Sequence, residues 1–134
     1  MRKGQSSLEF LLILAAFFAF LAVWVTVINS VREKSADAME QKYAELALSD
    51  LAGAGDEVYI LGSGNARELN VRLLGNATVS FEGGNVSISI LNDSRSFGRE
   101  VRFKTSQDGI ELEKGVNRII VKEEGDLVVF EKQP

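Results

Sequence analysis

An uncharged run of 19 residues, Phe10–Ile28, stands near the start of this chain and restricts its fold more than any other feature. At about 1.5 Å per residue, a helix of this run spans roughly the 30 Å hydrocarbon core of a bilayer. Glu9 stands directly before the run, although a carboxylate at the centre of a membrane helix costs about 2.5 to 3.5 kcal/mol. We therefore predict a membrane span over about 10–28 and take Glu9 as a candidate functional residue.

One long helix is predicted around this run, because no proline or glycine occurs from Ser6 to Ala52 and Gly53-Ala54-Gly55 then supplies a stop signal. We expect this helix over 5–54, with an amphipathic part over about 29–52. Apolar residues recur at helical spacing in the amphipathic part, and they should pack on the following domain or on a neighbouring helix: Ala36, Met39, Tyr43, Leu46, Ala47 and Leu51.

Small side chains form one face of the membrane half. They recur at i, i+4, i+7 and i+11, as Ala15, Ala19, Ala22 and Thr26. Such a face lets helices approach closely, so the three alanines are candidate assembly residues. The alternative is that alanine is present here as a common helix former.

The period of the apolar residues changes from about 3.6 to 2 after Gly55, which indicates strands. Alternating segments predict seven or eight short strands, at 58–61, 69–73, 79–81, 86–90, 101–103, 110–112, 118–121 and 127–130. Gly83-Gly84 and Glu124-Gly125-Asp126 are predicted hairpin turns. The fold class is therefore α+β, a long helix followed by a small antiparallel β-sandwich or partly open β-barrel head over 55–134.

Composition removes several functional classes. The chain has 134 residues with no cysteine and no histidine, which excludes a Ser-His-Asp or Cys-His triad and zinc sites that use these ligands. A net charge of −4 disfavours nucleic-acid binding. We therefore predict no catalytic residue, no cofactor and no metal, and we expect neither an enzyme nor a nucleic-acid partner.

Three Asn-x-Ser/Thr sequons are close together, at Asn76, Asn85 and Asn92. They are candidate N-glycosylation sites if this part of the chain is extracellular. The alternative is that each is an ordinary turn residue.

The first nine residues, Met1-Arg2-Lys3-Gly4-Gln5-Ser6-Ser7-Leu8-Glu9, place a basic leader and a polar patch before the apolar run. An ordinary secretory signal has its cleavage site after that run. This order resembles the class III signal peptide of archaeal type IV pilin-like proteins. The resemblance implies a leader over 1–4, cleavage by a prepilin peptidase between Gly4 and Gln5, and pairing of Glu9 with the Gln5 amine of a neighbouring subunit. An uncleaved N-terminal anchor is the alternative.

The resemblance further implies a structural subunit of an extracellular archaeal type IV-like pilus. Its expected partners are further copies of the chain, the prepilin peptidase and the pilus assembly machinery, with possible N-glycans. Arg2 and Lys3 before the span favour a cytoplasmic N-terminus for the precursor in the cell membrane, with the mature form in a surface filament that serves in adhesion. The alternative function is a minor pilin or a monomeric membrane-anchored adhesion or sugar-binding module.

Overall fold

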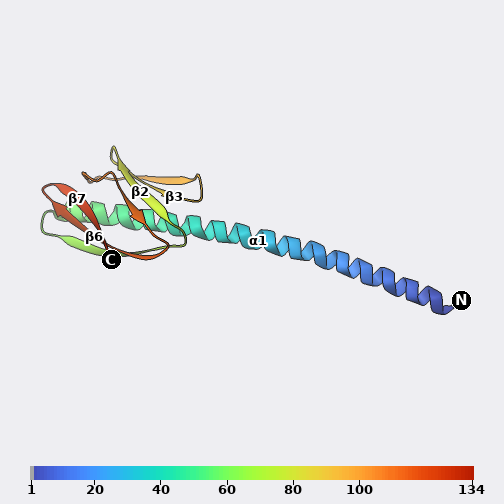
Figure 1. The fold of residues 1–134 in the computed structure, drawn as a ribbon. Helices are drawn as coiled ribbons and strands as arrows, with labels where there is room; N and C mark the ends of the chain where they lie inside the picture. Colours follow the sequence, from blue (N-terminus) through green and yellow to red (C-terminus); the bar gives the residue numbers. More distant parts are fainter. Residues whose placement is uncertain (1) are drawn as a thin grey trace. The chain divides into compact units, whose positions relative to one another are not determined.

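A computed structural model describes residues 2–134, and the side chains of residues 4–134. Met1, the first residue of the expected leader, lies outside the described residues, as do the side chains of Arg2 and Lys3. The elements are α1 (Arg2–Leu61), β1 (Ala66–Leu73), β2 (Ala77–Glu82), β3 (Asn85–Ile90), β4 (Ser96–Glu100), β5 (Gly109–Leu112), β6 (Gly115–Glu124) and β7 (Leu127–Gln133) (Figure 1). The predicted α+β class is confirmed, because one long helix is followed by antiparallel sheets. A long apolar N-terminal helix followed by such sheets is a type IV pilin-like architecture.

The helix is longer than predicted. It continues to Leu61, so a helix end at residue 54 and a strand over 58–61 are both wrong. Gly53 and Gly55 lie inside the helix, and a Cβ at Gly55 would collide with the ring of Phe103. Gly55 is thus a point of close approach between the helix and the head rather than a stop signal.

Gly62 directly follows the end of the helix, and its φ of 82° is in the left-handed region that glycine adopts without steric cost. The Gly62 N–H donates to the Val58 carbonyl at 3.0 Å. The side-chain amide of Asn65 then donates to the carbonyls of Leu61 and Gly62, at 2.9 and 3.0 Å. These bonds satisfy carbonyls that the last turn leaves without helical partners.

The strands form two open antiparallel sheets, which do not close into a barrel. One has three strands in the order β1-β6-β7, and the other has four in the order β4-β3-β2-β5. Both predicted hairpins are present, because Glu82 pairs with Asn85 and Glu124 pairs with Leu127 across two-residue turns. All four turn residues have positive φ, as the primed hairpin turns require.

The chain between β4 and β5 differs from the expected strand over 101–103. Val101 and Phe103 are buried on either side of exposed Arg102, which explains the alternating pattern. However, this segment crosses from one sheet to the other. The Val101 N–H donates to the Gly84 carbonyl at 2.9 Å, and the Lys104 carbonyl accepts from the Val128 N–H at 2.8 Å. The alternation of apolar and polar residues over 101–103 therefore reflects which side chains are buried, although this segment is not a strand of either sheet.

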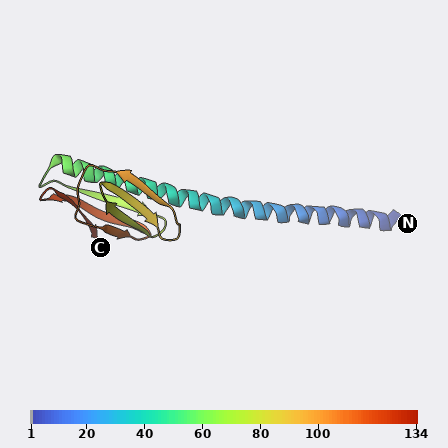
Figure 2. The ribbon, with the colours of Figure 1, turned by 90° about the horizontal axis from the view of Figure 1, so that it is seen from above.

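Contacts divide the chain into two units, Met1–Ala38 and Met39–Pro134, which we describe separately. In the second unit, the C-terminal part of α1 runs beside the strands in two perpendicular views (Figures 1 and 2). This part of α1 supplies one layer of the hydrophobic core through Ala44, Ala47, Leu48, Leu51, Ala52, Ala54 and Val58. The inward residues of both sheets complete the core, and its most buried members include Val79, Val86, Ile88, Ile119 and Val121.

Candidate functional site: the exposed apolar surface of the helix

The apolar half of α1 is exposed throughout. It is long and apolar enough to cross a membrane, and no part of its most apolar window is buried within the chain. Large apolar side chains from Leu8 to Val31 remain between 37% and 69% exposed. Water-soluble monomers rarely leave contiguous apolar patches larger than a few hundred Å² uncovered. This surface therefore differs from that of a water-soluble monomer, and its length and composition are those of a signal or membrane segment.

The expected cleavage site lies in the first turns of the helix. Gly4 and Gln5 are both helical and exposed, and a Cβ placed on Gly4 would meet no atom within 4 Å. The first four N–H groups of a helix have no helical acceptor, so unwinding this turn to present the bond breaks few hydrogen bonds. The fold thus places no structural requirement on glycine at position 4.

Glu9 is exposed on the helix at the edge of the apolar surface. Among the side chains described, from residue 4 onward, no basic group forms an ion pair with Glu9. A carboxylate in lipid or in a helical bundle is strongly disfavoured unless a cation or hydrogen-bond donors face it. A partner from outside this part of the chain is therefore needed wherever the surface around Glu9 is covered.

The predicted small face is on the exposed surface of α1, because Ala15, Ala19 and Ala22 all remain uncovered. The fourth member, Thr26, donates its hydroxyl to the Ala22 carbonyl at 3.0 Å. The hydroxyl is thus satisfied within the helix and does not oppose burial in an apolar environment. Larger rings form edge-to-face pairs nearby, between Phe17 and Phe18 and between Phe20 and Trp24.

The apolar stripe of the amphipathic part divides between two environments. Ala47 and Leu51 are buried in the core of the second unit, at 3% and 0% exposure. Met39 and Leu46 are instead exposed, at 54% and 49%. From the sequence, this stripe is expected to pack either on the following domain or on a neighbouring helix. In the structure, its inner residues pack in the domain and its outer ones remain uncovered.

The three sequon asparagines lie elsewhere, around the four-stranded sheet, and each is exposed. Asn76 directly precedes β2, Asn85 opens β3, and Asn92 is in the turn after β3. The structure therefore separates the candidate assembly residues, which are all on α1, from the candidate modification sites, which are all at the sheet.

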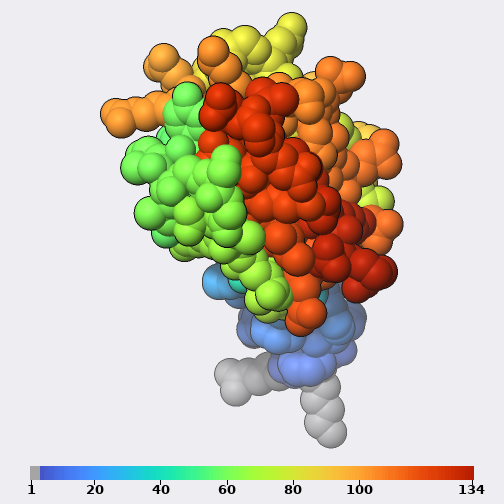
Figure 3. Space-filling model, turned by 90° about the vertical axis from the view of Figure 1, so that its left-hand side faces the viewer, coloured from blue at the N-terminus to red at the C-terminus, as the bar shows by residue number. Residues whose placement is uncertain are grey.

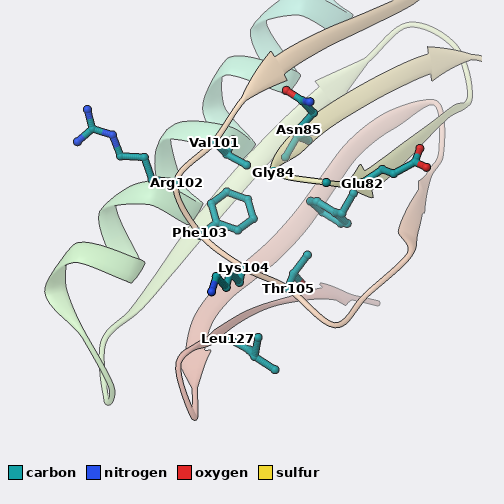
Figure 4. Close-up of a pocket in the computed structure, with 12 residues that line it drawn as sticks. Glu82, Gly84, Asn85, Val101, Arg102, Phe103, Lys104, Thr105 and Leu127 are labelled. Carbon is teal, nitrogen blue, oxygen red and sulfur yellow. The ribbon is translucent and has the colours of Figure 1, made fainter.

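A hollow of about 570 Å³ lies between the β2–β3 turn, the 101–105 segment and the start of β7. Phe81 and Phe103 contribute to its wall; Phe103 is also part of the hydrophobic core, and Phe81 packs against that core. Figure 4 shows that Arg102 and Glu82 point in opposite directions, away from the Phe103 ring. Ligand sites usually have polar groups that converge on the ligand, and these diverge.

Comparisons with protein-family models, with curated proteins and with solved structures give no match to this chain. The likeness to type IV pilins therefore depends on the N-terminal motif and on the architecture.

Proposed function

We propose that this chain is a structural subunit of an extracellular archaeal type IV-like pilus that serves in surface adhesion. The precursor is held in the cell membrane with its N-terminus in the cytoplasm. A prepilin peptidase cuts it between Gly4 and Gln5, and the pilus assembly machinery then packs mature chains into a homopolymer through their N-terminal helices. The role is structural, with no enzymatic activity.

The observation that carries this proposal is the uncovered apolar surface of α1 from Leu8 to Val31. A lipid bilayer covers such a surface before assembly, and equivalent helices of other copies cover it afterwards. Burying about 1,500 Å² at roughly 25 cal/mol per Å² corresponds to about 40 kcal/mol before entropy losses are subtracted. Mutual burial therefore offsets much of the cost that this surface would have in water once it leaves the lipid.

Cleavage supplies the partner that Glu9 requires. The new terminus at Gln5 carries an amine, which is charged at neutral pH because its ordinary pKa is about 7.7 to 8.0. An amine from a neighbouring copy then offsets the Glu9 carboxylate inside the bundle, where a lone charge is strongly disfavoured. An uncleaved chain lacks this cation at position 5, so processing and assembly are coupled.

The pairing is tested with Glu9→Gln, which removes the charge and keeps the shape. We expect filament yield to fall at least about tenfold, with the chain retained in the membrane, because the amine loses its counter-charge in an apolar surrounding. Glu33→Gln is the matched control, since Glu33 is also exposed on α1 but lies beyond the apolar run. Normal filament yield from Glu9→Gln would contradict the pairing.

Processing is tested with Gly4→Leu and N-terminal mass analysis of the native protein. The mature chain should begin at Gln5 in the natural sequence, and the variant should keep its leader and form no filaments. Because a Cβ at Gly4 meets no atom within 4 Å, a failure to mature reports on peptidase recognition rather than on misfolding. A natural chain that retains Met1 or Arg2 would support an uncleaved anchor instead.

Purified surface material separates this function from its alternative. Abundant fibres composed of this chain are expected from the host. A detergent-soluble monomer without fibres would instead indicate an anchored adhesion or sugar-binding module.

A further inference from the structure

The outer face of the four-stranded sheet has an unusual composition. In one row of paired residues, Ser89 lies between Thr78 and Ser96. In the next outward row, Ser87 lies between Ser80 and Gly98. These residues alternate with buried ones such as Val79 and Ile88, so they face outward. The outward positions in the register rows of this sheet contain no lysine, arginine or large apolar residue; they are Thr78, Ser80, Glu82, Asn85, Ser87, Ser89, Ser96, Gly98, Glu100, Gly109 and Glu111.

All three sequons border this outer face. Asn85 is on it, opposite Glu82 and next to Glu100 in the register. The turn before Asn85 is drawn in yellow at the surface of the unit (Figure 3). Asn76 and Asn92 are at the other end of the sheet, where the Leu91 N–H donates to the Asn76 carbonyl at 3.0 Å.

The other four asparagines of the chain lie away from the four-stranded sheet. Asn29 is on α1, and Asn65, Asn70 and Asn117 are in or next to the three-stranded sheet. None of the four begins an Asn-x-Ser/Thr sequence. Every asparagine at the four-stranded sheet is thus a sequon, and no asparagine elsewhere in the chain is one.

The side-chain amides are available for modification. All three asparagines are exposed, and the side chain of Asn76 uses its oxygen in the fold, where it accepts from the Lys114 N–H at 2.8 Å. N-glycosylation attaches sugar to the amide nitrogen and leaves this oxygen in place. The contact that Asn76 makes in the fold is therefore compatible with a glycan.

The same face is poorly suited to contact with protein. Serine and glutamate are depleted in protein interfaces, and binding energy concentrates in tryptophan, tyrosine and arginine. The outer face of the three-stranded sheet differs, because its paired positions include Val116, 69% exposed, and charge pairs such as Lys122 with Glu131 at 2.8 Å. On the four-stranded sheet, the exposed apolar side chain of Leu91 lies only at the edge, next to Asn76. Hydrogen bonds to Glu124 and Glu131 raise the pKa of Lys122 above its ordinary value.

We propose that the outer face of the four-stranded sheet is the glycan-bearing face of this protein, modified at Asn76, Asn85 and Asn92, and that it stays uncovered when copies of the chain assemble. The donor is an oligosaccharide activated through a phosphate linkage to a polyprenyl lipid. The amide nitrogen forms a bond with the anomeric carbon, the bond from that carbon to the phosphate oxygen breaks, and the lipid phosphate leaves with the electron pair. The amide nitrogen releases one proton.

The second half of this inference, the uncovered face, rests on the proposed filament. A bulky, hydrated glycan at both ends of the sheet prevents the dry, close packing of an interface core. Contacts between copies are then left to α1 and to the other surfaces of the head.

The modification is tested by glycopeptide mass spectrometry of the full chain from its native host. Each sequon peptide should carry a sugar mass, and Ser87→Ala should remove the mass at Asn85 while Ser87→Thr should retain it. Thr78→Val and Thr78→Ser make the same comparison for Asn76 and leave its bond to Lys114 intact. Unmodified sequon peptides in the natural chain would overturn the proposal, whether or not filaments form.

Exposure of the face is tested with single cysteines, since the natural chain has none. Ser89→Cys places a thiol on the outer face, and Leu46→Cys places one on the uncovered part of α1. The extent of labelling of Ser89→Cys by a small maleimide in filaments should stay within about twofold of its extent in the detergent-solubilised monomer. Leu46→Cys is labelled under the same two conditions and provides the comparison on α1. Protection of Ser89→Cys by tenfold or more upon assembly would show that this face is buried. Detergent-soluble material without filaments would contradict the proposed function, while the sugar masses would still report on the modification.

Discussion

At the scale of single residues, glycine has two opposite roles within α1. Gly53 is exposed, and a Cβ placed on it would meet no atom within 4 Å, whereas Gly55 faces the buried Phe103 ring. Phe103 in turn contacts Phe81 and Phe130, with ring centroids 6.4 and 5.5 Å away. The ring is thus held by neighbours and has little freedom to move aside.

We therefore predict opposite effects for two alanine substitutions in the same turn of the helix. Gly53→Ala should raise the free energy of unfolding by up to about 1 kcal/mol, because alanine favours a helix. Gly55→Ala should lower it by about 1 to 2 kcal/mol, because overpacking outweighs that gain. Urea unfolding of the full chain in detergent micelles, followed by circular dichroism, measures both. Equal stabilisation by the two substitutions would contradict the close approach at Gly55.

At the scale of elements, β7 is an edge strand that a side chain protects. The Phe130 N–H donates to Gln107 Oε1 at 2.8 Å, and Gln107 Nε2 donates to the Phe130 carbonyl at 2.9 Å. The Lys104 carbonyl accepts from the Val128 N–H in the same region. The segment before β5 thus occupies backbone groups that would otherwise be free to pair with another chain.

Removing the two hydrogen bonds between Gln107 and Phe130 should make the pairing of β7 less stable. Gln107→Ala is expected to lower the free energy of unfolding by about 1 to 3 kcal/mol, because it leaves a partly buried N–H and carbonyl of Phe130 without partners. Hydrogen exchange of the Phe130 amide should accelerate with it. Gln133→Ala, at the end of the same strand, is the control and should change neither quantity appreciably. Unchanged exchange in Gln107→Ala would show that the two hydrogen bonds contribute little.

At the scale of the whole molecule, the chain is organised as a surface that must be covered and a domain that has its own core. Residues up to Ala38 form one unit and residues from Met39 form the other, although a single helix runs through both. The first unit has no core of its own among its described side chains, since its apolar residues are exposed. The proposed function would cover these residues first with lipid and then with other copies of the chain.

The small face of the first unit gives a prediction for assembly. Ala19→Leu adds bulk where close approach is expected and should reduce filament yield by about tenfold, as an overpacking cost of about 1 to 3 kcal/mol implies. Ala16→Leu makes the same chemical change about a quarter-turn around the helix from the centre of the small face and should be better tolerated. Electron microscopy of sheared surface fractions measures the yield. Equal yields would indicate that alanine is there only as a helix former.

Much of this molecule follows from local patterns. Periodicity determines the long helix, most of the strands in nearly their observed places and the α+β class, because side-chain direction repeats at 3.6 residues in helices and at 2 in strands. It misses β4, in which Phe97 is the one large apolar residue. Gly83-Gly84 and Gly125-Asp126 mark both hairpins, because their turns need positive φ. The N-terminal motif and the sequons are likewise readable without a fold.

Only the tertiary structure decides what depends on neighbours distant in sequence. The helix continues past Gly55, where Ala54 and Val58 on either side of this glycine are buried in the core and Phe103 lies against it. Val101 and Phe103 are buried without a strand because their segment crosses between sheets. The apolar stripe divides between core and surface according to which side of α1 the sheets cover. Strand pairing likewise brings the three sequons to the borders of one outer face, with Asn85 in the paired rows and Asn76 and Asn92 at the other end of the sheet. A strand's periodicity specifies two faces, but its pairing specifies which residues share them.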